Sequence, residues 1–118
     1  MTSYASDVRV NSRQEKQAVG WALHYIEKLR QGESVSFRPR GNSMTGKIES
    51  GQLCTVAPVA PEALTVGDIV LCRVNGNEYL HLIKAVQGNR FQIGNNRGRI
   101  NGWITAKSIF GRCIRIEP

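Results

Sequence analysis

Apolar residues recur along the chain with two different spacings, which divide it into two parts. Between residues 12 and 32 they recur every three to four positions, as on one face of an α-helix. Ser12 and Glu15 have the spacing of a capping box, and Gly32 follows the last periodic position. We therefore predict a helix over 12–32, preceded by a loose arm over 1–11 that has no periodic pattern.

The rest of the chain, 34–118, consists of short runs rich in Val, Ile, Leu and Thr, separated by Gly, Pro and Asn. This pattern predicts a mainly β fold, a small β-barrel or coiled sheet that carries the single N-terminal α-helix. Asn75-Gly76 indicates a hairpin, because a type I′ turn needs positive φ at both positions. The predicted strands lie at 34–38, 52–57, 68–74, 78–87, 90–94 and 109–116.

Composition narrows the class of protein further. At 118 residues, with 41% hydrophobic and 21% charged residues, the chain fits one globular domain. A net charge of +7 favours acidic partners such as nucleic acid. Three cysteines without metal or disulfide spacing indicate a reducing compartment, and the polar first ten residues do not resemble a signal peptide. We predict a cytoplasmic protein with no membrane contact, no metal and no organic cofactor.

Candidate chemistry centres on a glycine-led turn, Gly41-Asn42-Ser43-Met44. Serine becomes a nucleophile only when a base removes its proton. A tight turn can also direct the backbone N–H groups of Asn42, Ser43 and Met44 at a developing oxyanion. The alternative is that Ser43 is an ordinary turn residue, and the turn by itself does not decide between the two.

The candidate base is His81, the one histidine of the β part of the chain. Histidine accepts a proton near neutral pH without help, whereas lysine must first be desolvated. Strand alternation places His81 and Lys84 on opposite faces, so Lys84 is the second choice of base. A half-buried strand histidine with one hydrogen bond is the structural alternative for His81.

Five segments, in this order, resemble the S24/S26 serine peptidase superfamily, which contains LexA-type self-cleaving repressors, UmuD-type proteins and signal peptidases. Together they cover about residues 35–118. The turn, together with Ile48, Gly51 and the strand Leu53 to Val56, resembles the nucleophile region of that superfamily. The later segments are Gly67-Asp68-Ile69-Val70, Tyr79 to Val86, Gly94-Asn95-Asn96 and Gly111-Arg112.

The resemblance implies a serine peptidase that acts on itself or on one protein partner. Ser43 would be the nucleophile, with its own N–H in the oxyanion hole. His81 falls at the base position of the histidine-type members, the endoplasmic reticulum and archaeal signal peptidases. Asn95 stands where an aspartate orients that base. Relatives often pair through their terminal strands, so the resemblance also allows a homodimer.

The second hypothesis is a catalytically inactive relative that binds nucleic acid or a protein through a basic surface. Arg38 and Arg40 precede the Ser43 turn, while Arg97 and Arg99 occupy a loop close in sequence to Trp103. Arginine next to an aromatic residue is typical of surfaces that contact phosphate and stack on bases. A solvated basic rim around a core tryptophan explains the same residues, and both explanations stay open.

Overall fold

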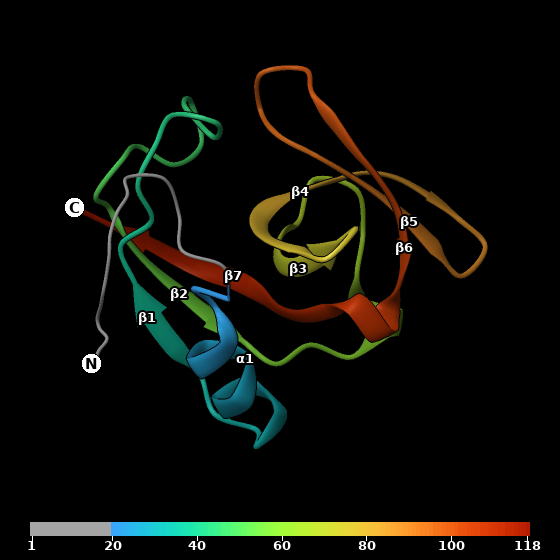
Figure 1. Ribbon diagram of the computed structural model, residues 1–118, viewed down its shortest axis with the longest axis horizontal. Helices are drawn as coiled ribbons and strands as arrows, with labels where there is room; N and C mark the ends of the chain where they lie inside the picture. Colours follow the sequence, from blue (N-terminus) through green and yellow to red (C-terminus); the bar gives the residue numbers. More distant parts are fainter. Residues whose placement is uncertain (1–19) are drawn as a thin grey trace.

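The computed structural model describes residues 20–118, which form one seven-stranded antiparallel sheet with a short helix against it (Figure 1). The strand order is β1-β2-β7-β3-β4-β5-β6, and β1 and β6 each pair with one neighbour. The prediction of a mainly β fold with one helix is confirmed, and the sheet is not closed into a barrel. The elements are α1 (Leu23–Arg30), β1 (Val35–Phe37), β2 (Leu53–Ala57), β3 (Ile69–Val74), β4 (Asn77–Gln87), β5 (Arg90–Gly94), β6 (Ile100–Thr105) and β7 (Ile109–Glu117), with single 3₁₀ turns at Pro61–Ala63 and Ala106–Ser108.

All six predicted strands are present, with ends within one residue of the prediction. Asn75 and Gly76 have φ values of 51° and 82°, as a type I′ turn between β3 and β4 requires. Strand β6 was not predicted, because Asn101-Gly102 in its middle is unfavourable in a strand. Pairing with β5 holds this segment extended despite its low propensity.

The helix is shorter than predicted. Gly20 has a φ of +77°, outside the helical range, and α1 begins only at Leu23. At its other end the N–H groups of Gly32 and Glu33 bond to the carbonyls of Leu29 and Lys28, so Gly32 ends the helix as predicted. The predicted arm and capping box lie outside the described residues.

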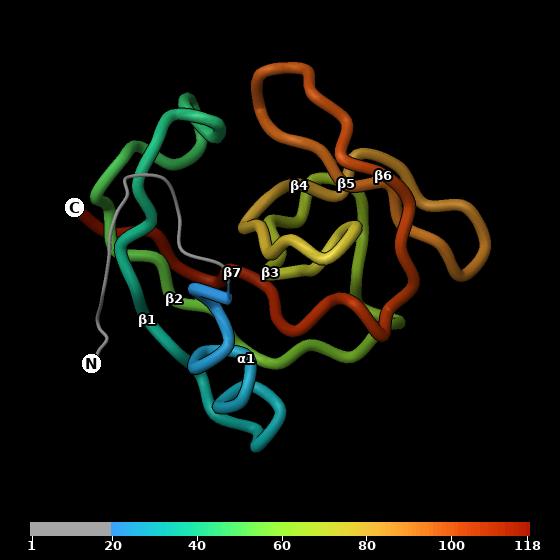
Figure 2. Tube along the Cα trace, in the orientation of Figure 1, coloured from blue at the N-terminus to red at the C-terminus, as the bar shows by residue number. Residues whose placement is uncertain are grey.

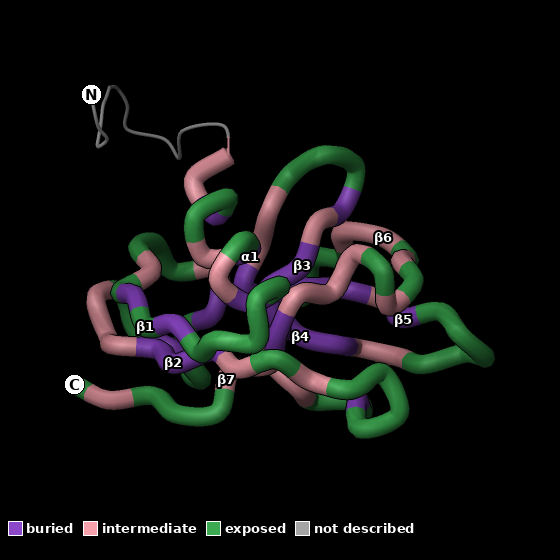
Figure 3. The backbone as a smooth tube through the Cα atoms, turned by 90° about the horizontal axis from the view of Figure 1, so that it is seen from below, coloured by how far each residue is buried: buried purple, intermediate pink, exposed green. Residues whose placement is uncertain are grey.

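Both faces of the central strands are buried (Figure 3). Along β3, Leu71 belongs to the core cluster under α1, whereas Val70 and Cys72 belong to a second cluster on the opposite face. In β4, Leu82 and Ile83 divide in the same way. Alternate side chains therefore fill two cores, one on each side of the sheet.

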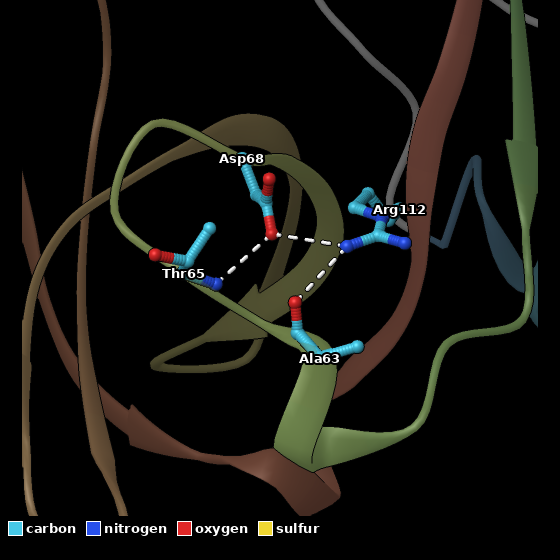
Figure 4. A network of polar contacts seen from close by, with 4 residues as sticks. All are labelled: Ala63, Thr65, Asp68 and Arg112. Carbon is cyan, nitrogen blue, oxygen red and sulfur yellow. Dashed lines mark hydrogen bonds and ion pairs between the residues drawn. The ribbon is translucent and has the colours of Figure 1, made fainter.

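Strand β7 crosses the middle of the molecule between β2 and β3 (Figure 2). Arg112 on β7 contacts the Asp68 carboxylate at 3.4 Å and donates to the carbonyl of Ala63 at 3.1 Å (Figure 4). The same Asp68 oxygen accepts a hydrogen bond from the N–H of Thr65 at 3.0 Å. These contacts tie the loop before β3 to β7 and give the Gly67-Asp68 and Gly111-Arg112 segments a shared structural role.

We predict that Gly111→Ala destabilises the fold. A Cβ at this position would lie 2.7 Å from Val56 Cγ1 and 2.8 Å from the carbonyl oxygen of Ala57. Because the backbone oxygen cannot move away freely, the free energy of unfolding should fall by about 1–3 kcal/mol in urea denaturation. Ile114→Ala on the same strand is the control, since Ile114 is 58% exposed and its loss should change stability by less than about 0.5 kcal/mol. Equal losses in the two variants would contradict the packing explanation.

Candidate active site

Ser43 lies in the long connection between β1 and β2. Met44 and Ile48 of this connection are buried, at 6% and 3% exposed, and anchor it in the core beneath α1. The base of the connection is closed by the N–H of Gly51, which donates to the carbonyl of Pro39 at 2.9 Å. The Ser43 side chain is therefore carried by a segment that is anchored at several points.

The structure brings Ser43 and His81 together. Ser43 Oγ lies 3.2 Å from His81 Nε2, at the outer limit for a nucleophile–base hydrogen bond. His81 extends from β4, is 7% exposed, and stacks on the ring of Tyr79 with a centroid separation of 4.7 Å. The imidazole is thus held in one orientation toward the serine.

The other ring nitrogen of the base contacts a residue that the sequence analysis did not single out. His81 Nδ1 lies 2.7 Å from Asn101 Oδ1 on β6. An amide oxygen only accepts hydrogen bonds, so this contact places the proton on Nδ1 and leaves the Nε2 lone pair facing Ser43. Asn101 is the extra residue of a β-bulge, because Ile93 pairs with Gly102 while Gly94 pairs with Ile100. A bulge changes the direction in which a side chain points, and no local sequence pattern predicts this bulge.

Asn95, which the resemblance places where an aspartate orients the base, makes other contacts in the structure. Its Oδ1 instead accepts hydrogen bonds from the N–H groups of Arg97 and Arg99, at 2.8 and 2.9 Å. An asparagine at the start of a loop commonly satisfies following backbone donors in this way. Asn95 therefore shapes the connection between β5 and β6, and Asn101 holds the position beside His81.

The neighbouring asparagine supports the nucleophile turn. The N–H of Asn96 donates to the carbonyl of Ser43 at 3.0 Å, and its side-chain amide donates to the carbonyl of Thr45 at 2.8 Å. Within residues 20–118, the N–H groups of Asn42, Ser43 and Met44 donate no hydrogen bond. The turn is thus fixed through its carbonyls, while its N–H groups remain available to an oxyanion.

Lys84, the second choice of base, has a different partner. It is the unpaired residue of a bulge in β4, since Ile83 pairs with Ile93 and Ala85 with Gln92. Its Nζ donates to the carbonyl of Asn95 at 3.3 Å. Lys84 therefore supports the connection between β5 and β6, whereas His81 is the residue that contacts Ser43.

The residues of the predicted basic surface have different contacts in the structure. Arg38 donates to the backbone oxygens of Gly51 and Pro118, at 2.8 and 3.3 Å, while Arg40, Arg97 and Arg99 are exposed. The guanidinium carbon of Arg90 lies 5.5 Å from the centroid of the Trp103 ring. Arg90, which was not among the predicted residues, therefore contacts this tryptophan.

A pocket of about 310 Å³ lies beside the two candidate catalytic residues. Ser43 and His81 form part of its lining, together with residues from the segment around α1, from β1 and from β4. The volume is at the lower end of the range for small-molecule and side-chain sites. The candidate nucleophile is therefore accessible from a preformed cavity.

Two further features of residues 20–118 concern membranes and metal ions. Within that range, no helix is long and apolar enough to cross a membrane. No group of three or more His, Cys, Asp or Glu side chains is placed there to hold a metal ion. Cys54, Cys72 and Cys113 carry free thiols.

We predict that His81 titrates at lower pH than an ordinary histidine. Burial lowers the pKa of His81 below the usual 6.5; the hydrogen bond to Asn101 opposes this shift and the charge of Arg99 adds to it. A His24→Gln variant removes the other histidine, so NMR chemical shifts of the remaining imidazole should report an inflection below pH 6.5.

The same shift gives the sign of a pH effect on stability. The unfolded state binds more protons than the folded state between the two pKa values, so stability is complete above pH 6.5 and falls as the pH drops through this window. His81→Gln should remove this part of the pH dependence in urea denaturation. An unchanged pH dependence in that variant would show that other groups cause it.

Comparison of the chain with protein-family models and with curated protein sequences gives no match. A function must therefore be argued from the geometry and chemistry of the site.

Proposed function

We propose that this protein is a serine hydrolase of peptide bonds that uses Ser43 as nucleophile and His81 as general base. The observation that carries the proposal is the chain of contacts from Ser43 Oγ to His81 Nε2 at 3.2 Å and from His81 Nδ1 to Asn101 Oδ1 at 2.7 Å. A nucleophile, a base and a third group that orients the base are the parts that covalent acyl transfer requires.

The proposed reaction begins when His81 Nε2 takes the proton of Ser43 Oγ as that oxygen bonds to the carbonyl carbon of the substrate. The carbonyl π electrons move to its oxygen, which accepts hydrogen bonds from the free N–H groups of the turn. The imidazolium then returns its Nε2 proton to the amide nitrogen as the C–N bond breaks, leaving an ester on Ser43. Water attacks this ester with His81 again as base, and the proton released to His81 returns to Ser43 Oγ.

Asn101 would make this dyad a slow one. Its neutral amide can hold the imidazole in the right tautomer, but it stabilises an imidazolium less than a carboxylate does. Slow turnover is adequate for an enzyme that cleaves itself or a single protein partner. The resemblance of residues 35–118 to the S24/S26 superfamily supports peptides as the substrate class and the same two residues as the dyad.

A fluorophosphonate probe tests the nucleophile directly. We expect the full chain to be labelled and Ser43→Ala to lose essentially all labelling, because the probe reacts with an activated serine. Ser108→Ala is the matched control, since this serine lies in the 3₁₀ turn before β7 and should leave labelling unchanged. Equal labelling of the wild-type and Ser43→Ala proteins would overturn the assignment.

We predict that Asn101→Asp accelerates the reaction of Ser43 with the probe. A carboxylate at this position stabilises the imidazolium, so the rate should rise roughly tenfold or more and the acid limb of its pH profile should move to higher pH.

Asn95→Asp provides the comparison, because it preserves the acceptor for the N–H groups of Arg97 and Arg99 and does not contact His81. It should leave both the rate and the acid limb nearly unchanged. The same pH shift in both variants would indicate a general charge effect rather than contact with His81.

One observation favours the second hypothesis, a binding module for nucleic acid. Within residues 20–118, Arg40, Arg97 and Arg99 form no ion pair with a carboxylate. Uncompensated arginine can contact phosphate, and such binding weakens steeply with salt. Salt-dependent affinity for single-stranded RNA would support this function, and affinity that is flat with salt would count against it.

A further inference from the structure

The pocket beside Ser43 has an aromatic wall built from the chain around α1 and from β1. The ring of Phe37 lies 4.6 Å from that of Tyr25, nearly parallel, and 5.7 Å from that of Trp21 in an edge-to-face arrangement. Trp21 Nε1–H donates to the carbonyl of Glu78 at 3.3 Å, which fixes the indole against β4. Three rings that hold each other form a wall that exists before any ligand binds.

The rest of the apolar lining comes from the nucleophile connection and from β4. Met44, Ile48 and Leu80 are buried and line the same pocket. The cavity therefore offers an apolar surface that leads directly to Ser43 and His81. A side chain that fills it must be large and apolar to replace the water there with favourable contacts.

The two acidic groups of the lining also differ in their partners. The Glu78 carboxylate, 7% exposed, pairs with Arg73 at 2.8 Å. A carboxylate oxygen of Glu49 accepts a hydrogen bond from the N–H of Gly46 at 3.0 Å, which fixes this side chain on the nucleophile turn. The charge of Glu78 is therefore compensated, whereas the exposed Glu49 keeps its charge.

The two basic groups of the lining differ in their partners. Arg38 donates to the carbonyl of Gly51 and to the backbone oxygen of Pro118, the last residue of the given sequence, whereas Arg40 forms no ion pair within residues 20–118. Both line the pocket together with the aromatic residues. Arg40 therefore presents a positive charge at the rim of the cavity.

We propose that this pocket is the specificity site of the enzyme for a peptide in which a large apolar side chain, preferably aromatic, lies next to the scissile bond and beside an acidic residue. The aromatic wall holds the apolar side chain, and Arg40 pairs with the acidic one. This inference rests on the proposed function, because the dyad at the pocket edge is what makes a peptide the expected occupant. A cavity of about 310 Å³ suits one large side chain better than an extended ligand.

The test measures binding by the full chain with the Ser43→Ala substitution, so that no cleavage occurs. Fluorescent hexapeptides with Phe-Glu, Ala-Glu and Phe-Lys at the centre are compared by anisotropy. We expect Phe-Glu to bind roughly tenfold or more tightly than Ala-Glu, because a large apolar group gains its burial energy only in a fitting pocket. Phe-Glu should also bind more tightly than Phe-Lys, by a factor that shrinks as salt is added.

Matched variants localise the two preferences. Trp21→Ala should reduce the advantage of Phe over Ala, and the exposed Arg40→Glu change should reverse the preference between Glu and Lys without disturbing the core. Trp103→Ala and Arg90→Glu are the controls, since both residues lie on β5 and β6, at the opposite end of the sheet from β1 (Figures 1 and 3). These controls should keep both preferences.

Three outcomes would overturn the proposal. They are equal binding of the Phe-Glu and Ala-Glu peptides, equal effects of Arg40→Glu and Arg90→Glu, and displacement of the Phe-Glu peptide by a single-stranded oligonucleotide. The last outcome would make the pocket a site for a nucleic-acid base.

Failure of the pocket and failure of the catalysis give different results. Selective peptide binding without fluorophosphonate labelling of the wild-type protein would support the pocket proposal and contradict the catalytic function. Labelling at Ser43 without peptide selectivity would support the catalytic function and contradict the pocket proposal.

Discussion

The candidate site depends on the pairing of β7 with both β2 and β3. In the strand order β1-β2-β7-β3-β4-β5-β6, this last strand of the chain joins the half that carries Ser43 to the half that carries His81 and Asn101. Gly111 allows the close approach, because a side chain there would collide with the backbone of β2. The two candidate catalytic residues therefore meet only when the C-terminal strand is in place.

Contacts outside the sheet strengthen the connection between the two halves. Asn96, in the second half, donates a hydrogen bond to the carbonyl of Ser43, and the ion pair between Asp68 and Arg112 ties the loop before β3 to the joining strand. Because Asn96 bonds to a carbonyl of the turn, the N–H groups of Asn42, Ser43 and Met44 have no acceptor in the described part of the chain and could serve the proposed oxyanion. The polar contacts thus hold the serine in place without using the backbone donors that would stabilise an oxyanion.

In the proposed reaction the base is oriented by an amide, where a carboxylate would be more effective. Asn101 fixes the tautomer of His81 but adds no negative charge, so burial dominates and the pKa of His81 falls. A base of low pKa is neutral and ready over a wide pH range, but it is a weak proton acceptor. The pocket adds an aromatic wall and the side chain of Arg40 beside this base, so the proposed selectivity and the proposed chemistry would arise at the same place.

The amino-acid sequence by itself determined the mainly β class, six of the seven strands, the Asn75-Gly76 turn and the end of the helix at Gly32, because periodicity and turn conformation are local properties. It also singled out Ser43 and His81 as a pair. Only the tertiary structure decided that Asn101, and not Asn95, contacts His81. That contact spans β4 and β6 with β5 between them, and it depends on a bulge that shifts the register by one residue. The aromatic pocket could likewise not be predicted from the sequence, because Trp21, Phe37 and Leu80 are far apart in the chain and meet only when the sheet and the helix pack together.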